Sequence, residues 1–398
     1  MTSADYVKPS FNPLVEKLAP PPIPSVQAWA RSYDGAHGNL IDMSQAVPGY
    51  APHADLLKWL SDAAGSPAYA GYGTIEGDLE LRKVYAEHVG SLYGTMLTAA
   101  NIHLTAGCNQ AFVATITAIA KAGDAVLMTN PCYFNHETTL QMMGIEPRYF
   151  PCHAENGFVP RVEDVEAALD GVKVLALVTP NNPTGAVYPA EVISEIFELC
   201  RRKGIWLVLD ETYRDFIEPG AGRPHALFDV KDWRDYLIQL YSFSKSFCIP
   251  GHRLGAITAS EAVIEQVAKV MDNLQICAPR TPQFAVARGI PALVDWREEN
   301  RLEIGRRAAA MRAAFARQNG WQLQAIGAYF AFVRHPFEGL TSSQAAERLA
   351  KDFGIVTIPG SYFGEGLEQH LRVAFANVDA EQIAEMGKRL RRIDVDQM

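Results

Sequence analysis

Apolar residues form three nearly continuous runs in the middle of the chain, over residues 172–178, 204–210 and 236–242. In none of the runs do apolar and polar residues alternate, as they would in a strand with one solvent-exposed face. We therefore expect strands of a parallel sheet that is covered on both faces. A segment with helical periodicity, residues 190–203, separates the first two runs. The pattern therefore predicts β-α-β units and an α/β fold.

From about residue 300 onwards the pattern mixes helices with short strands, which indicates a smaller α+β domain. The expected helices cover 301–319, 342–353 and 380–392, and the expected strands cover 328–333 and 370–376. A proline-rich stretch, residues 19–24, predicts an extended arm rather than a packed element. We expect three parts, namely an N-terminal arm that joins the small domain (1–46), a large domain (47–290) and a small C-terminal domain (291–398).

Composition and charge narrow the classes of partner. The net charge of −9 over 398 residues argues against a nucleic-acid backbone, because phosphates are neutralised by clustered Lys and Arg. No apolar run reaches about 18 residues, so we expect no membrane span, and the N-terminus lacks the pattern of a secretory signal. The six cysteines form no C-x-x-C pair, so we expect buried free thiols in the cytoplasm and no metal site.

Polar residues that can do chemistry follow each of the three central runs. The first run is followed by PNNPTG, which contains Asn182; the second ends in Asp210, with Tyr213 shortly after it; and Lys245 follows the third. Each feature alone has an ordinary explanation, since Pro and Asn suit turns, Asp often caps helices and most lysines are solvated. Because ligands bind beyond the carboxyl ends of parallel strands, however, neighbouring strands would bring an amide, a carboxylate, a phenol and an amine to one site.

A glycine turn with Gly107, Cys108 and Asn109 precedes a helical pattern over 111–121. The N–H groups and the dipole at such a helix start suit an anion, although many glycine turns bind nothing. Arg253, in the sequence GHRLG, could add a fixed positive charge to the same anion, with an ordinary salt bridge as the alternative.

Taken in order, the motifs P-N-N-P-T-G, D-E-x-Y and S-x-S-K followed by G-x-R-x-G resemble those of a known enzyme family. They are similar to the fold type I aminotransferases that depend on pyridoxal 5′-phosphate (PLP), in the class I/II or aspartate-aminotransferase-like group. The resemblance spans about residues 40–378. It implies a large domain with a mainly parallel, mixed central sheet flanked by helices, and a smaller α+β domain. It also implies a transaminase that moves an amino group between an L-amino acid and a 2-oxo acid in ping-pong half-reactions.

The resemblance implies roles for individual residues. Lys245 matches the lysine that forms the Schiff base with PLP, and Asp210 matches the aspartate beneath the pyridine nitrogen. Tyr213 and Asn182 match the pair on the cofactor's 3′-oxygen. This set suits the reaction, because a carboxylate keeps the ring protonated and the freed lysine can move the proton at Cα. The phosphate contacts implied by the family are Gly107, Cys108, Asn109, Ser242 and Arg253.

Three further matches concern the cofactor ring, the substrate and a partner subunit. Tyr133 lies where the family stacks an aromatic side chain on the pyridine, with an ordinary core aromatic as the alternative. Arg372 matches the arginine that binds the substrate's α-carboxylate, for which a planar pair of donors is suited. Tyr72 aligns with the tyrosine that reaches the phosphate in the partner subunit, which implies a homodimer with shared active sites.

The chain departs from the family pattern at two places that bear on which substrate side chain the enzyme accepts. Aspartate-specific members carry a second arginine for the distal carboxylate, but residues 271–275 contain none and Arg280 lies past that position. Near the N-terminus, Ala46 replaces the usual glycine in a segment that borders the substrate. We expect Ala46 to contact the substrate together with Asn182 and Arg372.

Two other functions would use the same cofactor residues. A PLP-dependent β-eliminating lyase, such as a carbon–sulfur lyase, needs the same lysine, aspartate and arginine, but releases pyruvate and ammonia without a 2-oxo acid acceptor. A non-catalytic PLP-binding regulatory domain usually follows a DNA-binding helix-turn-helix, and no basic segment of that kind precedes residue 40. We therefore expect a transaminase.

Overall fold

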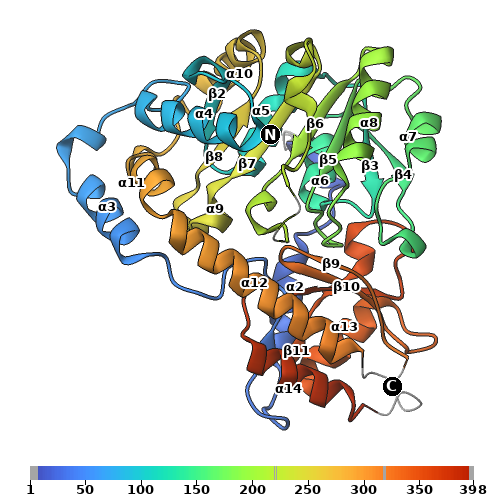
Figure 1. The fold of residues 1–398 in the computed structure, drawn as a ribbon. Helices are drawn as coiled ribbons and strands as arrows, with labels where there is room; N and C mark the ends of the chain where they lie inside the picture. The colour runs from blue at the N-terminus through green and yellow to red at the C-terminus, as the bar shows by residue number, and fades with distance from the viewer. Residues whose placement is uncertain (1–7, 219, 221, 317–319, 394–398) are drawn as a thin grey trace, which may run out of the picture.

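The computed structural model describes residues 8–218, 220, 222–316 and 320–393, and these form two main sheets of unequal size (Figure 1). The seven-stranded sheet lies among helices in the upper part of the view, and the four-stranded sheet lies below it. This mixed α/β architecture with a smaller second part confirms the predicted fold class. The start of the predicted arm (1–7) and the end of the helix predicted over 301–319 (317–319) lie outside the described residues.

The larger sheet places most of its strand ends on one edge. Its strands lie in the order β2 (Ile102–Thr105), β8 (Gly255–Thr258), β7 (Leu237–Ser242), β6 (Trp206–Asp210), β5 (Val174–Val178), β3 (Ala125–Asn130) and β4 (Glu146–Pro151). All neighbours are parallel except at β8, which runs antiparallel to both β2 and β7. Because β8 alone is reversed, its start lies at the same edge as the carboxyl ends of the other strands.

Both faces of the central strands of the larger sheet are buried, which explains why β5 and β6 are almost entirely apolar. In β5, Leu175 and Leu177 pack into one hydrophobic cluster, whereas Val174 and Ala176 pack into another on the opposite face. The first cluster includes α4 (Leu79–Tyr93), α7 (Val162–Ala168), α8 (Ala190–Lys203) and α11 (Arg280–Ala292). The second includes α5 (Cys108–Ile119), α6 (Phe134–Met142) and α10 (Glu261–Leu274).

The smaller sheet is antiparallel and has its own hydrophobic cluster. Its strand order is β12 (Ile358–Pro359), β13 (His370–Ala374), β10 (Phe330–Arg334) and β9 (Gln322–Gly327). The helices of this cluster are α12 (Val294–Phe315), α13 (Ser342–Phe353) and α14 (Ala380–Leu390). The N-terminal segment joins this part, since β1 (Ile41–Asp42) pairs with β11 (Ile355–Val356) and α2 (Pro22–Arg31) packs on α13.

The expectation of an extended arm over residues 19–24 is wrong for its second half. Pro22 begins α2, and Pro24 lies in the first turn of that helix. Proline is tolerated there because the first N–H groups of a helix have no partner within the helix. The predicted limits of α8 and α13 match the structure, whereas α12 begins at Val294 instead of 301.

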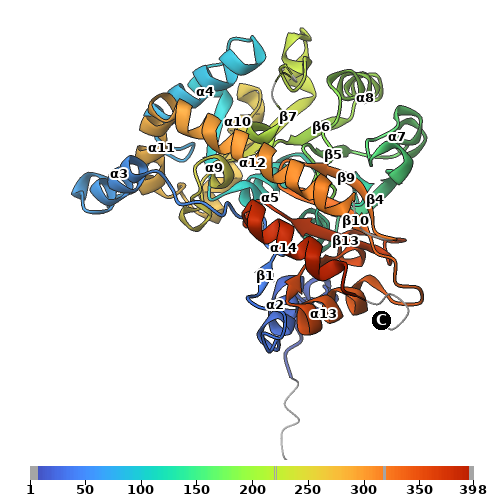
Figure 2. The ribbon, with the colours of Figure 1, turned by 60° about the horizontal axis from the view of Figure 1, so that its bottom comes forward.

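The remaining helices are α1 (Pro13–Glu16), α3 (Ala54–Ala64) and α9 (Phe243–Ser246). Figure 2 shows α3 and α11 together on one side of the molecule, with α12 running from there toward the small sheet. Five of the six cysteines are buried, and Cys277 is partly exposed. Among the described residues, no helix has the length and apolarity needed to cross a membrane.

Candidate active site

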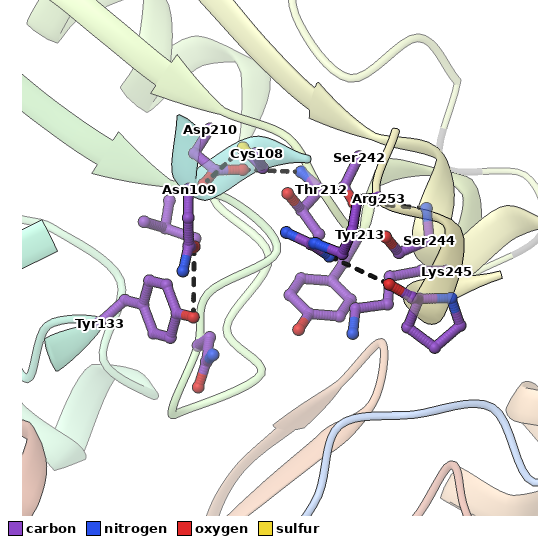
Figure 3. A pocket seen from close by; sticks show the side chains of 13 residues that line it. Cys108, Asn109, Tyr133, Asp210, Thr212, Tyr213, Ser242, Ser244, Lys245 and Arg253 are labelled. Atoms are coloured by element: carbon purple, nitrogen blue, oxygen red, sulfur yellow. Dashed lines mark hydrogen bonds between the residues drawn. The ribbon is translucent and has the colours of Figure 1, made fainter. Parts of the chain in front are cut away.

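One cavity, shown in Figure 3, lies beyond the shared edge of the larger sheet. Side chains reach it from the turns after β2, β3, β5, β6 and β7, and from the turn before β8. The structure brings together nine of the residues that the sequence singles out, namely Cys108, Asn109, Tyr133, Asn182, Asp210, Tyr213, Ser242, Lys245 and Arg253. The lining also contains four residues that sequence reasoning missed, namely Val178, Thr212, Ser244 and Pro250.

Lys245 is held in this cavity by the short helix α9 that directly follows β7. Ser242 caps the helix, since its hydroxyl accepts a hydrogen bond of 3.3 Å from the Ser244 amide. The Lys245 ammonium donates to the carbonyl of Ala46, which places the predicted Ala46 segment beside the amine. Burial, followed by the charges of Arg253 and Arg372, lowers the pKa of Lys245 to about 8. A lysine in this setting has an accessible neutral form, which is the nucleophilic one.

Asp210 ends β6 and lies beside Cys108 at the top of the view in Figure 3. The Thr212 amide donates to its Oδ1 at 2.9 Å, the Cys108 thiol donates to its Oδ2 at 3.3 Å, and His136 Nε2 lies 3.4 Å from the same Oδ2. Burial alone would raise the pKa of Asp210, but the His136 ring and the Thr212 donors lower it below its usual value. The site therefore holds an ionised carboxylate despite its burial.

His136 is a further residue that sequence reasoning missed. It lies in the first turn of α6, one turn after Tyr133, and its ring stacks on Phe112 with centroids 3.8 Å apart. Phe112 belongs to α5, so two helices on one face of the sheet fix the position of the imidazole against Asp210. In the sequence, His136 stands one helical turn after Tyr133, but that spacing does not indicate a contact with Asp210.

Arg253 lies beside the start of α5 at another side of the cavity. Arg253 adopts a left-handed backbone conformation, with φ of 51°. Its guanidinium donates to the Pro250 carbonyl at 3.1 Å and to the Ala106 carbonyl at 3.2 Å. Gly107 lies so close that a Cβ there would overlap this guanidinium. The positive side chain is thus fixed beside the N-terminus of a twelve-residue helix, a combination that suits a phosphate.

Tyr133 and Tyr213 border the cavity from opposite sides in Figure 3. Tyr133 donates weakly to Asn109 Oδ1 at 3.5 Å, and its hydroxyl accepts a hydrogen bond from Asn135 at 2.9 Å. Tyr213 is buried, and its ring centroid lies 5.9 Å from the Lys245 nitrogen. Burial raises the pKa of Tyr213 well above its usual value, so its phenol remains a hydrogen-bond donor at neutral pH.

Arg372 approaches this region from β13 of the smaller sheet. It is buried, and its guanidinium donates to Asn182 Oδ1 at 3.1 Å and to the carbonyl of Ser44. Burial lowers the pKa of Arg372 to about 10, so the side chain is still charged at neutral pH. Its hydrogen-bond partners among the described residues, the Asn182 amide and the Ser44 carbonyl, are both uncharged. Such a buried cation suits an incoming carboxylate.

Tyr72 does not reach the cavity of its own chain. Its side chain is 79% exposed, in the segment before α4. Gly107 lies directly behind the cavity lining rather than in it.

The cavity fits PLP in four respects. It offers a partly buried amine, a buried carboxylate for a protonated ring nitrogen, a fixed cation beside a helix N-terminus for a phosphate, and the buried Ser244 hydroxyl, for which no hydrogen-bond partner is found among the described residues. The last observation indicates a polar group that a ligand in this cavity can satisfy.

The model of the family "Aminotransferase class I and II" matches residues 38–390. The chain is 27% identical over 375 residues to the aromatic aminotransferase ISS1 of Arabidopsis thaliana, covering 92% of this chain and 93% of that protein. It is 28% identical over 335 residues to an aspartate aminotransferase of Sulfurisphaera tokodaii, covering 81% and 82%. Its fold is similar to that of a double mutant of Thermus thermophilus aspartate aminotransferase, with a TM-score of 0.87, 24% identity, and coverage of 97% of this chain and 100% of that one. The chain therefore belongs to the class I and II aminotransferases, a PLP-dependent family, and is a transaminase.

Proposed function

We propose that this transaminase moves an amino group between an L-amino acid and a 2-oxo acid in two half-reactions, with PLP bound covalently through Lys245. The observation that carries the proposal is the cavity in which Lys245, Asp210 and Arg253 lie at successive strand ends. These three side chains supply an amine for the cofactor's aldehyde, an anion for its ring nitrogen and a cation for its phosphate.

When bound, PLP supplies a protonated ring that accepts electron density from the substrate's Cα. The ionised Asp210 would hold the proton on the ring nitrogen, and His136 and Thr212 would keep that carboxylate in place. Tyr213 and Asn182 would donate to the 3′-oxygen, and Tyr133 would stack on the ring. The phosphate would be held by Cys108, Asn109, Ser242 and Arg253, with Gly107 allowing the close approach of Arg253.

Lys245 would also carry the proton at the substrate's Cα. With a pKa of about 8, roughly a tenth of the free amine is neutral at pH 7, so both protonation states are accessible near neutrality. Asp210 is unsuited to this step because its lowered pKa makes it a weak base.

Arg372 would bind the α-carboxylate of the substrate, with Asn182 and Ala46 next to it. Its fork of donors can bind both carboxylate oxygens, and its present partners, an amide oxygen and a backbone carbonyl, are neutral. Arg280 is already bound to Asp78 at 3.1 Å and to the carbonyl of Ala68 at 2.7 Å. We therefore propose that it does not bind a distal carboxylate, and that the enzyme has no preference for dicarboxylates.

We further propose that the enzyme is a cytoplasmic homodimer with shared active sites, in which Tyr72 reaches the phosphate in the partner subunit. The exposure of Tyr72 in the single chain supports this proposal, because an aromatic side chain that is 79% exposed has most of its surface free for a partner.

The covalent attachment is tested with purified protein and added PLP. We expect a yellow protein in which borohydride reduction fixes the cofactor's mass on the peptide that contains Lys245. Lys245→Ala should lose the visible absorbance and the turnover. A wild-type protein that stays colourless with PLP would refute the proposal.

The reaction is tested by supplying an amino acid with and without a 2-oxo acid. A transaminase stops after one half-reaction when the acceptor is absent. Continuous release of pyruvate and ammonia without an acceptor would instead identify a β-eliminating lyase.

A further inference from the structure

Arg280 ties together the segment that carries Tyr72. It is the first residue of α11, and its Nε donates to the two carboxylate oxygens of Asp78 at 3.1 and 3.3 Å. Its Nη1 donates to the carbonyls of Ala68 and Gly71 at 2.7 and 3.4 Å. One guanidinium thus joins three points of the chain that lie before and after Tyr72.

The packing around this guanidinium is close. The Arg280 Cζ lies 5.0 Å from the ring centroid of Tyr69, and a Cβ on Gly73 would lie 2.8 Å from Asp78 Oδ1 and 3.1 Å from the Arg280 side chain. The amide of Gly73 also donates to the Cys277 thiol at 3.4 Å. Both neighbours of Tyr72 in sequence, Gly71 and Gly73, are therefore contacted from α11 or the turn before it.

We propose that Arg280 is a positioning residue that holds the segment over residues 67–73 so that Tyr72 is presented to the cofactor phosphate of the partner subunit. This inference rests on the proposed function, in which Tyr72 contacts that phosphate. The physical reason is preorganisation. A tyrosine on a free glycine-flanked segment would lose conformational entropy on binding, whereas a segment already fixed by Arg280 loses less. The planar guanidinium suits this task because its donors point in several fixed directions.

The affinity for PLP tests the proposal without relying on turnover. Arg280→Met removes the charge and the donors but keeps an apolar stem. We expect Arg280→Met and Tyr72→Phe each to weaken PLP binding by about tenfold or more, as expected for the loss of a hydrogen bond to a charged group. The double variant should bind PLP no worse than the weaker single variant, because both changes remove the same contact.

Arg288→Met is the matched control. Arg288 lies on the same helix, its guanidinium is 3.8 Å from Glu80 of α4, and it packs over the Phe284 ring at 3.5 Å. It thus links α11 to the first turn of α4, close to Asp78, but its polar partners are not in the Tyr72 segment. We expect the Arg288→Met variant to bind PLP with the affinity of the wild type. An equal loss in Arg288→Met would mean that any arginine between these helices has the same effect, and would overturn the proposal.

Mixed dimers test whether Arg280 acts on the partner's site. Lys245→Ala and Arg280→Met subunits carry different affinity tags, and the heterodimer is purified. Its Arg280→Met subunit retains Lys245 and receives Tyr72 from a subunit with an intact Arg280. We expect that one site per heterodimer binds PLP with wild-type affinity and is active. A heterodimer with no such site would show that Arg280 acts within its own subunit, which contradicts the proposal.

The outcomes separate this inference from the function on which it rests. If wild-type protein fails to bind PLP, or if Lys245→Ala keeps it covalently, the proposed function is wrong. If those tests succeed but the two single losses add in the double variant, only the role of Arg280 is wrong. Should Arg280→Met not fold, Arg280→Lys keeps the charge beside Asp78 but cannot bind both carbonyls. Wild-type PLP affinity in Arg280→Lys would overturn the proposal.

Discussion

Arg372→Met gives the sharpest test of how this enzyme recognises an amino acid. Arg372 is a buried cation whose partners in the structure are Asn182 Oδ1, at 3.1 Å, and the carbonyl of Ser44. A substrate carboxylate would provide the charged partner. Removing one member of a buried, hydrogen-bonded charge pair costs about 2–5 kcal/mol, so the half-reaction with an amino acid should lose about 30-fold to several thousand-fold in kcat/KM.

The loss should depend on the substrate's carboxylate. The assay is the change in the visible absorbance of the bound cofactor on mixing with an amino donor. We expect Arg372→Met to react slowly with an amino acid, whereas the amine that lacks the carboxylate should react equally slowly with the variant and with the wild type. Arg372→Lys keeps a charge but not the planar pair of donors. Its activity with the amino acid should therefore lie between that of Arg372→Met and that of the wild type.

Binding of PLP provides the control for this variant. Arg372 does not line the cavity that holds Lys245 and Asp210, so the affinity for PLP should stay within about threefold of the wild type, a range within which substitutions away from a contact usually fall. An equal loss of amino-acid and amine reactivity, or a loss of PLP together with activity, would refute the assignment of Arg372 to the substrate.

Two further predictions concern pH. His136→Phe removes a group that lowers the pKa of Asp210. The pKa of Asp210 should therefore rise, and the acidic limb of the pH profile of kcat/KM should move to higher pH. An unchanged acidic limb would show that His136 does not act on Asp210. The rate at which the cofactor-free enzyme bonds to PLP should rise with pH through about 8 and then level off, because only neutral Lys245 attacks an aldehyde. Arg253→Gln removes a nearby cation and should move that rise to higher pH, and a rise at an unchanged pH would contradict the link.

The parts of the site that could be predicted from the sequence are those set by strand ends. Asp210 ends one buried apolar run and Lys245 comes shortly after another. Because the carboxyl ends of parallel strands meet at one edge, their proximity follows from local pattern and a general rule of topology. Arg253 is different, because it precedes β8, the reversed strand. Its position at the same edge depends on the antiparallel direction of β8, which the apolar pattern does not reveal.

The contacts that could not be predicted link residues far apart in sequence. Arg280 binds Asp78 across 202 positions, and His136 meets Asp210 only because α6 and α5 pack on the same face of the sheet. Periodicity fixes which face of a helix is apolar, but not which polar side chain at its end meets which strand. The expectation for the proline-rich stretch is wrong for a local reason, since prolines favour both extended segments and the first turn of a helix.

The substrate site depends on how the two sheets pack, in addition to the residues that line it. Arg372 belongs to the smaller sheet, whereas Asn182 and Lys245 follow strands β5 and β7 of the larger one. The backbones of Gly185 and Gly327 meet between them so closely that a Cβ on either glycine would overlap the other's backbone. A side chain at either position would push the sheets apart and move Arg372 away from Asn182. Close packing at a contact that contains neither residue therefore contributes to the relative position of Arg372 and Lys245, together with the Arg372–Asn182 hydrogen bond.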